Sequence, residues 1–72
     1  MFEEVKEIIQ KYTEETVTPE SKLVEDLGLT SLDVVSIVGD FEDAFEIEIE
    51  DEDILDFTTV TDILDYINVH QN

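Results

Sequence analysis

Apolar residues recur at helical spacing in three stretches of the chain. The first stretch runs from residue 2 to about residue 13, the second from residue 31 to 45, and the third follows Thr59. Spacings of three and four residues place side chains on one face of a helix, so each stretch is predicted to form a helix with one buried face. The apolar positions are Phe2, Val5, Ile8, Ile9 and Tyr12, then Val34, Ile37, Val38, Phe41 and Phe45, and finally Val60, Ile63, Leu64 and Ile67.

The second and third stretches begin with the same signal. Thr30 precedes the second and Thr59 precedes the third, and each threonine is followed three residues later by an aspartate, Asp33 or Asp62. A threonine N-cap with an acid at the third helical position forms a capping box, in which each side chain accepts a hydrogen bond from the other residue's backbone. The second helix is therefore predicted to begin at Ser31.

Residues 45–50 read FEIEIE, an alternation that is typical of a strand. The chain offers no second strand of similar quality to pair with it, and an isolated strand is not stable. We therefore expect an extended connector that directs Ile47 and Ile49 into the core, followed by a helical turn or two within residues 51–57. Residues available for burial there are Ile54, Leu55 and Phe57. The predicted fold is all-α, a small four-helix bundle of three principal helices and one short helix.

The connection between residues 13 and 30 is polar and is punctuated by Pro19 and Gly28. Leu23, Leu27 and Leu29 recur within it. Because apolar side chains gain free energy by leaving water, we expect this connection to be held against the core. It is longer than most connections, and long ordered loops are often functional.

Charge restricts the possible partners. The chain has 21 acids against three lysines, no arginine, and a net charge of −18. Nucleic acid is excluded as a direct partner because phosphate contacts need clustered Lys and Arg, and an anionic membrane surface is disfavoured for the same reason. A basic protein surface is the complementary partner. The simpler interpretation is that excess acid keeps a small protein soluble.

Size indicates a single domain over residues 1–72, without cysteine for a disulfide. No apolar run approaches the roughly 20 residues of a membrane span. The N-terminal segment is acidic and amphipathic, unlike a signal or transit peptide, so a cytoplasmic location is expected.

Residues 25–33, EDLGLTSLD, resemble the prosthetic-group attachment site of acyl carrier proteins, in which a Gly-x-Asp-Ser-Leu sequence opens the second helix. The resemblance extends to residues 18–21, 45–49 and 59–67, and so covers nearly the whole chain. It implies a bundle of acyl-carrier type that is not an enzyme. It also implies that Ser31 carries a covalent 4′-phosphopantetheine arm holding acyl intermediates as thioesters. These would be delivered to enzymes of fatty acid synthesis or of a specialised acyl or polyketide pathway; the cargo is left open.

The predicted position of Ser31 agrees with this role. With Thr30 as N-cap, Ser31 is the first helical residue and lies beside backbone N–H groups that have no intrahelical partner. A helix N-terminus favours an anion, so a phosphodiester is tolerated there despite the acidic surroundings. The plain alternative is a serine that merely begins a helix.

The chain departs from the family pattern at three positions. Thr30 replaces the usual aspartate before the serine, and Ser36 and Gly39 stand where the family more often has an acid and a larger apolar residue. Gly39 lowers helix propensity by about 1 kcal/mol relative to alanine. These changes face partner enzymes and predict a specialised carrier, with neutral drift as the alternative.

The predicted contact surface around Ser31 consists of Leu32, Val35, Glu42 and Asp43. The expected partners are a phosphopantetheinyl transferase and acyl-transferring or acyl-modifying enzymes with basic docking patches, met by a monomer through a small polar interface. For Glu42 and Asp43, an ordinary solvated helix face is the alternative. The resemblance further implies an acyl-chain cavity, although packing explains the same residues equally well. They are Phe41, Phe45, Ile54, Ile63 and Leu64.

Two other functions compete with a modified carrier. One is a carrier-like module that never receives the arm and only binds proteins, which Thr30 favours. The other is a divalent-cation binder, but residues 46–53 lack the mid-loop glycine of an EF-hand, so no metal site is predicted. Catalysis is not expected, because His70 stands alone near the C-terminus without a nucleophile or orienting partner and reads as a surface or frayed-end residue.

Overall fold

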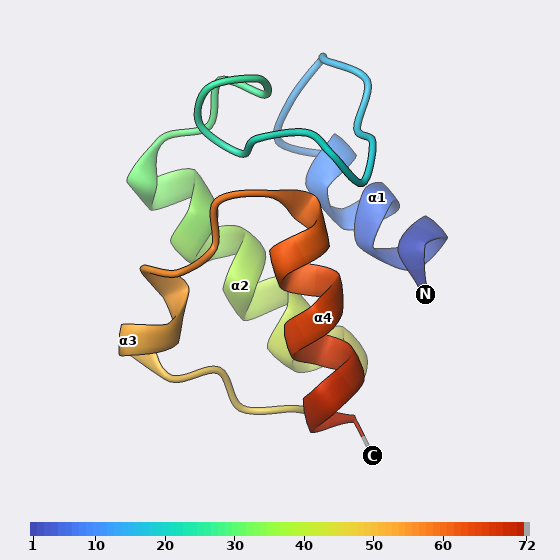
Figure 1. The fold of residues 1–72 in the computed structure, drawn as a ribbon, viewed down its shortest axis with the longest axis vertical. Helices are drawn as coiled ribbons and strands as arrows, with labels where there is room; N and C mark the ends of the chain where they lie inside the picture. The colour runs from blue at the N-terminus through green and yellow to red at the C-terminus, as the bar shows by residue number, and fades with distance from the viewer. Residues whose placement is uncertain (72) are drawn as a thin grey trace.

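The computed structural model describes residues 1–71, in which the predicted all-α fold is confirmed (Figure 1). The helices are α1 (Phe2–Gln10), α2 (Ser31–Phe45), α3 (Asp51–Ile54) and α4 (Val60–His70). Figure 1 shows α2 in the middle of the molecule, with α4 crossing in front of it and the short α3 to one side. Helix α2 contacts both α1 and α3. The described residues contain no strand, only an isolated antiparallel bridge.

Helix α1 ends at Gln10, earlier than the apolar spacing indicated. The N–H groups of Lys11 and Tyr12 bond to the carbonyls of Ile8 and Ile9, so the last turn tightens to i→i−3 bonds. Gln10 Nε2 then donates to the backbone oxygens of residues 13 and 15 and draws the chain away from the helix axis. Tyr12 still packs against the core, and its hydroxyl donates to Asp40 Oδ2 of α2 at 2.7 Å.

The two predicted capping boxes are both present, one before α2 and one before α4. Thr30 Oγ1 accepts from the Asp33 N–H at 3.2 Å, and Asp33 Oδ2 accepts from the Thr30 N–H at 3.1 Å. The box of Thr59 and Asp62 repeats this arrangement. Helix α2 therefore begins at the predicted residue.

The connection before α2 is held to the core, as its leucines indicated. Leu23, Leu27 and Leu29 are buried. The Leu23 N–H donates to the Thr58 carbonyl at 2.9 Å, and the Val60 N–H donates to the Ser21 carbonyl at 3.0 Å. These two bonds fasten the connection to the start of α4.

The segment after α2 is an extended connector, as predicted. Glu46 caps α2 in the left-handed conformation at φ 54° and ψ 48°, which turns the chain out of the helix. Ile49 is buried and Ile47 packs against the core. Helix α3 then follows, with Ile54 half-buried and in contact with the core, whereas Leu55 is 85% exposed. Of the three residues that were available for burial, Ile54 and Phe57 pack against the core and Leu55 does not, because α3 spans one turn and can present only one side to the core.

Candidate functional site

Ser31 is the first residue of α2 and is exposed. Thr30 precedes it in an extended conformation, at φ −89° and ψ 170°, and its hydroxyl is engaged by Asp33. The Asp33 carboxylate in turn accepts a hydrogen bond from the Thr30 N–H, so both capping side chains are hydrogen-bonded to each other's backbone, while Ser31 beside them is exposed. The backbone N–H of Ser31 precedes the first intrahelical bond of α2, as at any helix start.

An apolar groove of about 200 Å³ opens beside Ser31, between the start of α2 and helix α3. Ser31 shares its lining with six apolar residues drawn from the connection, from α2 and from the α3 region. They are Val24, Val34, Val35, Ile54, Leu55 and Phe57. The site thus combines an exposed serine at a helix N-terminus with an adjacent apolar groove. Only Ile54 of the residues that were predicted to line an acyl cavity reaches this groove.

The four residues predicted to contact partner enzymes differ in how exposed they are. Leu32 and Val35 are 79% and 55% exposed, and Asp43 is exposed further along α2. Glu42 is half-buried, and its Oε2 accepts a hydrogen bond from the Ile49 N–H at 3.0 Å. Glu42 therefore fastens the connector after α2, a contact seven residues away in sequence that helical periodicity did not reveal.

The other residues predicted to line an acyl cavity pack against one another in the core or at its edge. Phe41 and Ile63 are almost fully buried, and the rings of Phe41 and Phe45 lie 6.1 Å apart. Leu64 packs against this cluster from α4. An acyl cavity at these residues stays a prediction.

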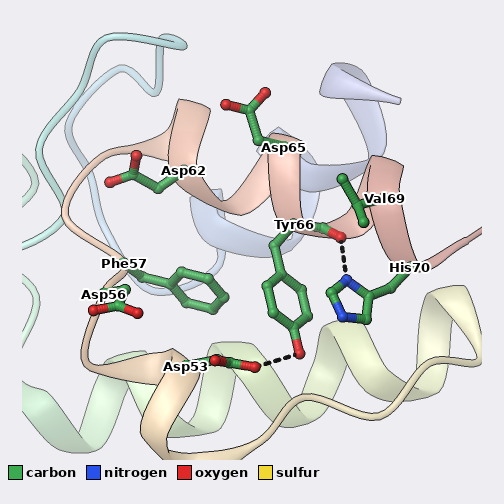
Figure 2. Close-up of a pocket in the computed structure, with 8 residues that line it drawn as sticks. All are labelled: Asp53, Asp56, Phe57, Asp62, Asp65, Tyr66, Val69 and His70. Carbon is green, nitrogen blue, oxygen red and sulfur yellow. Dashed lines mark hydrogen bonds between the residues drawn. The ribbon is translucent and has the colours of Figure 1, made fainter.

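A larger hollow, of about 340 Å³, lies between α3 and α4 (Figure 2). Figure 2 shows Tyr66 at its centre, where the phenol donates to Asp53 Oδ2 at 2.8 Å and the ring stacks on His70 at 3.9 Å. Burial and the bond to Asp53 raise the pKa of Tyr66. His70 is exposed but not frayed, because Nδ1 lies 2.9 Å from the Tyr66 carbonyl oxygen. These contacts join α3 to α4, and Ser31 is not among the residues that line the hollow.

Among residues 1–71, no group of three or more His, Cys, Asp or Glu side chains is placed to hold a metal ion. No helix in the same range is both long and apolar enough to cross a membrane.

Comparison with known proteins gives consistent results. The family model described as "Phosphopantetheine attachment site" matches residues 3–67. An acyl carrier protein of Clostridium perfringens (strain 13 / Type A) is 42% identical over 73 residues, covering 97% of this chain and 96% of the relative. One of Thermotoga maritima is 44% identical over 70 residues, covering 93% and 86%. A solved structure assigned as an acyl carrier protein of Mycobacterium tuberculosis superposes with a TM-score of 0.87 at 31% identity, covering 94% of this chain and 95% of that one.

Proposed function

Because the chain belongs to the acyl carrier protein family, whose members carry covalent 4′-phosphopantetheine, we propose that Ser31 is the attachment residue and that the arm carries acyl groups as thioesters. Residues 1–72 form one carrier domain, which serves enzymes as a substrate and catalyses no step itself. The pathway is fatty acid synthesis or a specialised acyl or polyketide pathway.

The observation that carries this proposal is the exposed Ser31 hydroxyl at the first position of α2. When a transferase joins Ser31 Oγ to the pantetheine-bearing phosphorus of coenzyme A, the pyrophosphate bond breaks, adenosine 3′,5′-bisphosphate leaves and the hydroxyl proton is lost. One negative charge of the new phosphodiester is then placed at the helix start. Backbone N–H groups and the positive end of the helix dipole favour an anion at that point. The Thr30 side chain does not occupy the place of this anion, since its hydroxyl accepts the Asp33 N–H in the capping box.

The apolar groove beside Ser31 suits the methyl and methylene groups of the arm. Val35 and Leu55 form exposed parts of its wall, and Ile54 lies deeper. When bound, the arm supplies a terminal thiol for thioester formation, a group that this cysteine-free chain lacks. The protein's part is to present that thiol to successive enzymes.

Docking of those enzymes is proposed at Leu32, Val35, Glu42 and Asp43. The two exposed apolar residues supply a small desolvated centre, and the acids attract Lys and Arg of a transferase or of an acyl-handling enzyme. Asp43 is the stronger acidic contact, because Glu42 also holds the Ile49 N–H. A small polar interface allows the rapid release that a carrier needs.

The proposal is tested by intact mass before and after incubation with coenzyme A and a broad-specificity phosphopantetheinyl transferase. The parent is expected to gain one phosphopantetheine and Ser31→Ala none. Ser36→Ala is the matched control for the site, since Ser36 is also an exposed serine of α2 but lies beyond its first turn. At the end of the reaction it should still gain one phosphopantetheine, even if its place on the docking face slows the transfer. A gain in Ser31→Ala would refute the site.

A second candidate function is an unmodified protein-interaction module, which Thr30 favours because it replaces the family's usual aspartate. The same experiment decides between the two functions. A parent that gains no mass with several transferases would identify the chain as such a module.

A further inference from the structure

The hollow between α3 and α4 has a floor of aromatic rings. The rings of Phe57 and Tyr66 meet edge to face with their centres 5.4 Å apart, and the ring of His70 stacks on that of Tyr66. Figure 2 shows the three rings in a row across the hollow, with Val69 beside them. Val69 is apolar and yet 69% exposed. The hollow thus presents packed aromatic and aliphatic groups to the solvent.

Carboxylates surround this floor. Figure 2 shows Asp62 and Asp65 on one side of the row of rings, Asp53 on the other, and Asp56 at one end. Asp53 and Asp62 already accept hydrogen bonds within the fold. Asp56 and Asp65 are exposed, and within residues 1–71 no side-chain hydrogen bond or ion pair engages either carboxylate. Two carboxylates are therefore open to a ligand at the edge of an apolar floor.

The hollow continues toward the segment that follows α2. A second hollow, of about 440 Å³, shares Asp53, Tyr66 and His70 with the first. Its other lining residues are Glu46, Ile47, Glu48 and Glu50. We call the two hollows together the α3–α4 furrow. Among the described residues that line it there is no lysine or arginine, so acids border the furrow along its whole length.

Charge and surface chemistry together define the occupant of the furrow. With a net charge of −18, the chain repels a second copy of itself, nucleic acid and an anionic membrane. The occupant is therefore cationic, and the apolar floor requires that it also has apolar surface. Arginine meets both conditions, because its aliphatic stem packs on apolar groups and its planar guanidinium stacks on aromatic rings. The guanidinium also binds a carboxylate through two parallel hydrogen bonds.

We propose that the α3–α4 furrow is a docking site for an arginine-bearing basic segment of a partner protein. An arginine stem lies on the floor beside Val69, and guanidinium groups bind Asp56 and Asp65. A segment of chain suits the site better than a single small cation, because two joined hollows offer acids at successive places along the furrow.

The furrow and the groove beside Ser31 are separate places. Phe57 lines both, and the two share no other lining residue. A partner bound in the furrow therefore leaves Ser31 uncovered and holds the chain while the arm is used elsewhere. This consequence rests on the proposed function, whereas the docking site itself does not.

Titration of the isotope-labelled protein with the synthetic peptide acetyl-Arg-Leu-Arg-Leu-Arg-amide at low salt tests the site by NMR. The largest amide shifts are expected at Asp56, Asp65 and Val69. Asp56→Asn combined with Asp65→Asn should weaken binding about tenfold, at roughly threefold for each exposed ion pair. The matched control is Glu14→Gln combined with Glu15→Gln, which changes the net charge equally at exposed positions of the connection and should stay within about twofold of the parent.

Two further comparisons test the aromatic and apolar floor apart from the charge. Val69→Ser leaves the charge unchanged at an exposed position, and it should weaken binding about threefold because part of the apolar floor is lost. A peptide with lysine in place of each arginine should also bind more weakly, since an ammonium group is a point charge without a planar face.

Four results would overturn the proposal. One is a set of shifts centred on α2 instead of α3 and α4. Another is an equal loss of affinity in the Glu14 and Glu15 control, which would show general attraction to an acidic chain. A third is unchanged binding by Val69→Ser. The last is spermidine binding at the same residues as tightly as the peptide, which would make the furrow a site for a small cation.

The proposed function and this inference fail separately. Peptide binding by a chain that no transferase modifies would refute the carrier function and leave the docking site standing. Modification at Ser31 without peptide binding would do the reverse. Loading of the arm should leave the peptide affinity within about twofold, and a larger loss would show that the furrow and the groove are not occupied together.

Discussion

Helices α2 and α4 begin with the same capping box, yet the two helix starts are built into the molecule differently. At α4, Asp62 Oδ2 accepts from the N–H groups of both Thr58 and Thr59, at 2.9 and 3.0 Å. Val60, the residue after the Thr59 cap, is fully buried, and its N–H donates to the carbonyl of Ser21. The start of α4 is thereby fastened to the connection that runs before α2.

At α2 the same box stands alone at the surface. Thr30 is exposed, Asp33 Oδ2 accepts from the Thr30 N–H, and the following residue is the exposed Ser31. The capping box determines where each helix begins, and the burial of the residue after the cap determines whether that helix start is accessible. The start of α4 is packed into the fold, whereas the start of α2 is accessible from solvent.

The largest difference in stability between the two helix starts is expected on mutation of the residue after each cap, Val60 in α4 and Ser31 in α2. Val60→Ala removes buried methyl groups and leaves a cavity, so it should lower the free energy of unfolding by about 2 kcal/mol. Ser31→Ala changes an exposed side chain and should stay within about 0.5 kcal/mol of the parent. Urea unfolding followed by circular dichroism measures both.

Val60→Ala and Ser31→Ala should differ in the opposite sense when their modification is measured. Val60→Ala, at a temperature where it is folded, is expected to accept the phosphopantetheine arm like the parent, whereas Ser31→Ala should not. Equal losses of stability in the two variants would mean that the start of α2 belongs to the hydrophobic core as much as the start of α4 does.

Local patterns predicted much of this contrast. The capping boxes depend on residues three apart, so the Thr-x-x-Asp spacing was enough to place the starts of α2 and α4. Helical periodicity identified the buried faces, and the lack of a pairing partner correctly removed the strand at residues 45–50. The motif also predicted Ser31 as the attachment residue, and its predicted place as the first residue of α2 is confirmed.

Contacts between distant segments could not be read in this way. The bonds that fasten residues 21–23 to residues 58–60 join backbone groups, and backbone groups leave no mark in side-chain periodicity. The groove beside Ser31 takes Val24 and Leu55 from opposite sides of α2 in sequence. Leu55 was available for burial as an apolar residue, but a helix as short as α3 has too few positions facing the core, and Leu55 is exposed.

A second, smaller difference is expected at the aspartates of the two boxes. Asp62→Asn weakens two charge-assisted hydrogen bonds at a half-buried position and should lower the free energy of unfolding by about 1 to 2 kcal/mol. Asp33 is also half-buried, but Asp33→Asn weakens only one such bond, from the Thr30 N–H, and should lower the free energy of unfolding by about 0.5 kcal/mol. Urea titrations of the two variants, side by side, measure the difference. A larger loss in Asp33→Asn would show that the α2 box is the more strongly held of the two.

The smallest effect is the pH dependence of the α4 box. Hydrogen bonds from the Thr59 and Thr58 N–H groups hold the pKa of Asp62 below its ordinary value of 3.8. A carboxyl group with a depressed pKa in the folded state adds stability that is fully present above the unfolded pKa, near 4, and is lost as pH falls through the folded pKa. The parent and Asp62→Asn should therefore differ in their free energy of unfolding by a constant amount from pH 7 to about pH 5. This difference should become smaller below pH 4.

Val60→Ala is the control for this measurement, because it changes no titratable group. Its free-energy difference from the parent should stay constant over the same pH range, even though both proteins lose stability as their many other carboxylates are protonated. If the Asp62→Asn difference is equally constant, the carboxylate charge does not stabilise the start of α4. The stability of the start of α4 would then come from the burial of Val60 and from its backbone hydrogen bond to Ser21. The two capping boxes would differ only in the residues that surround them.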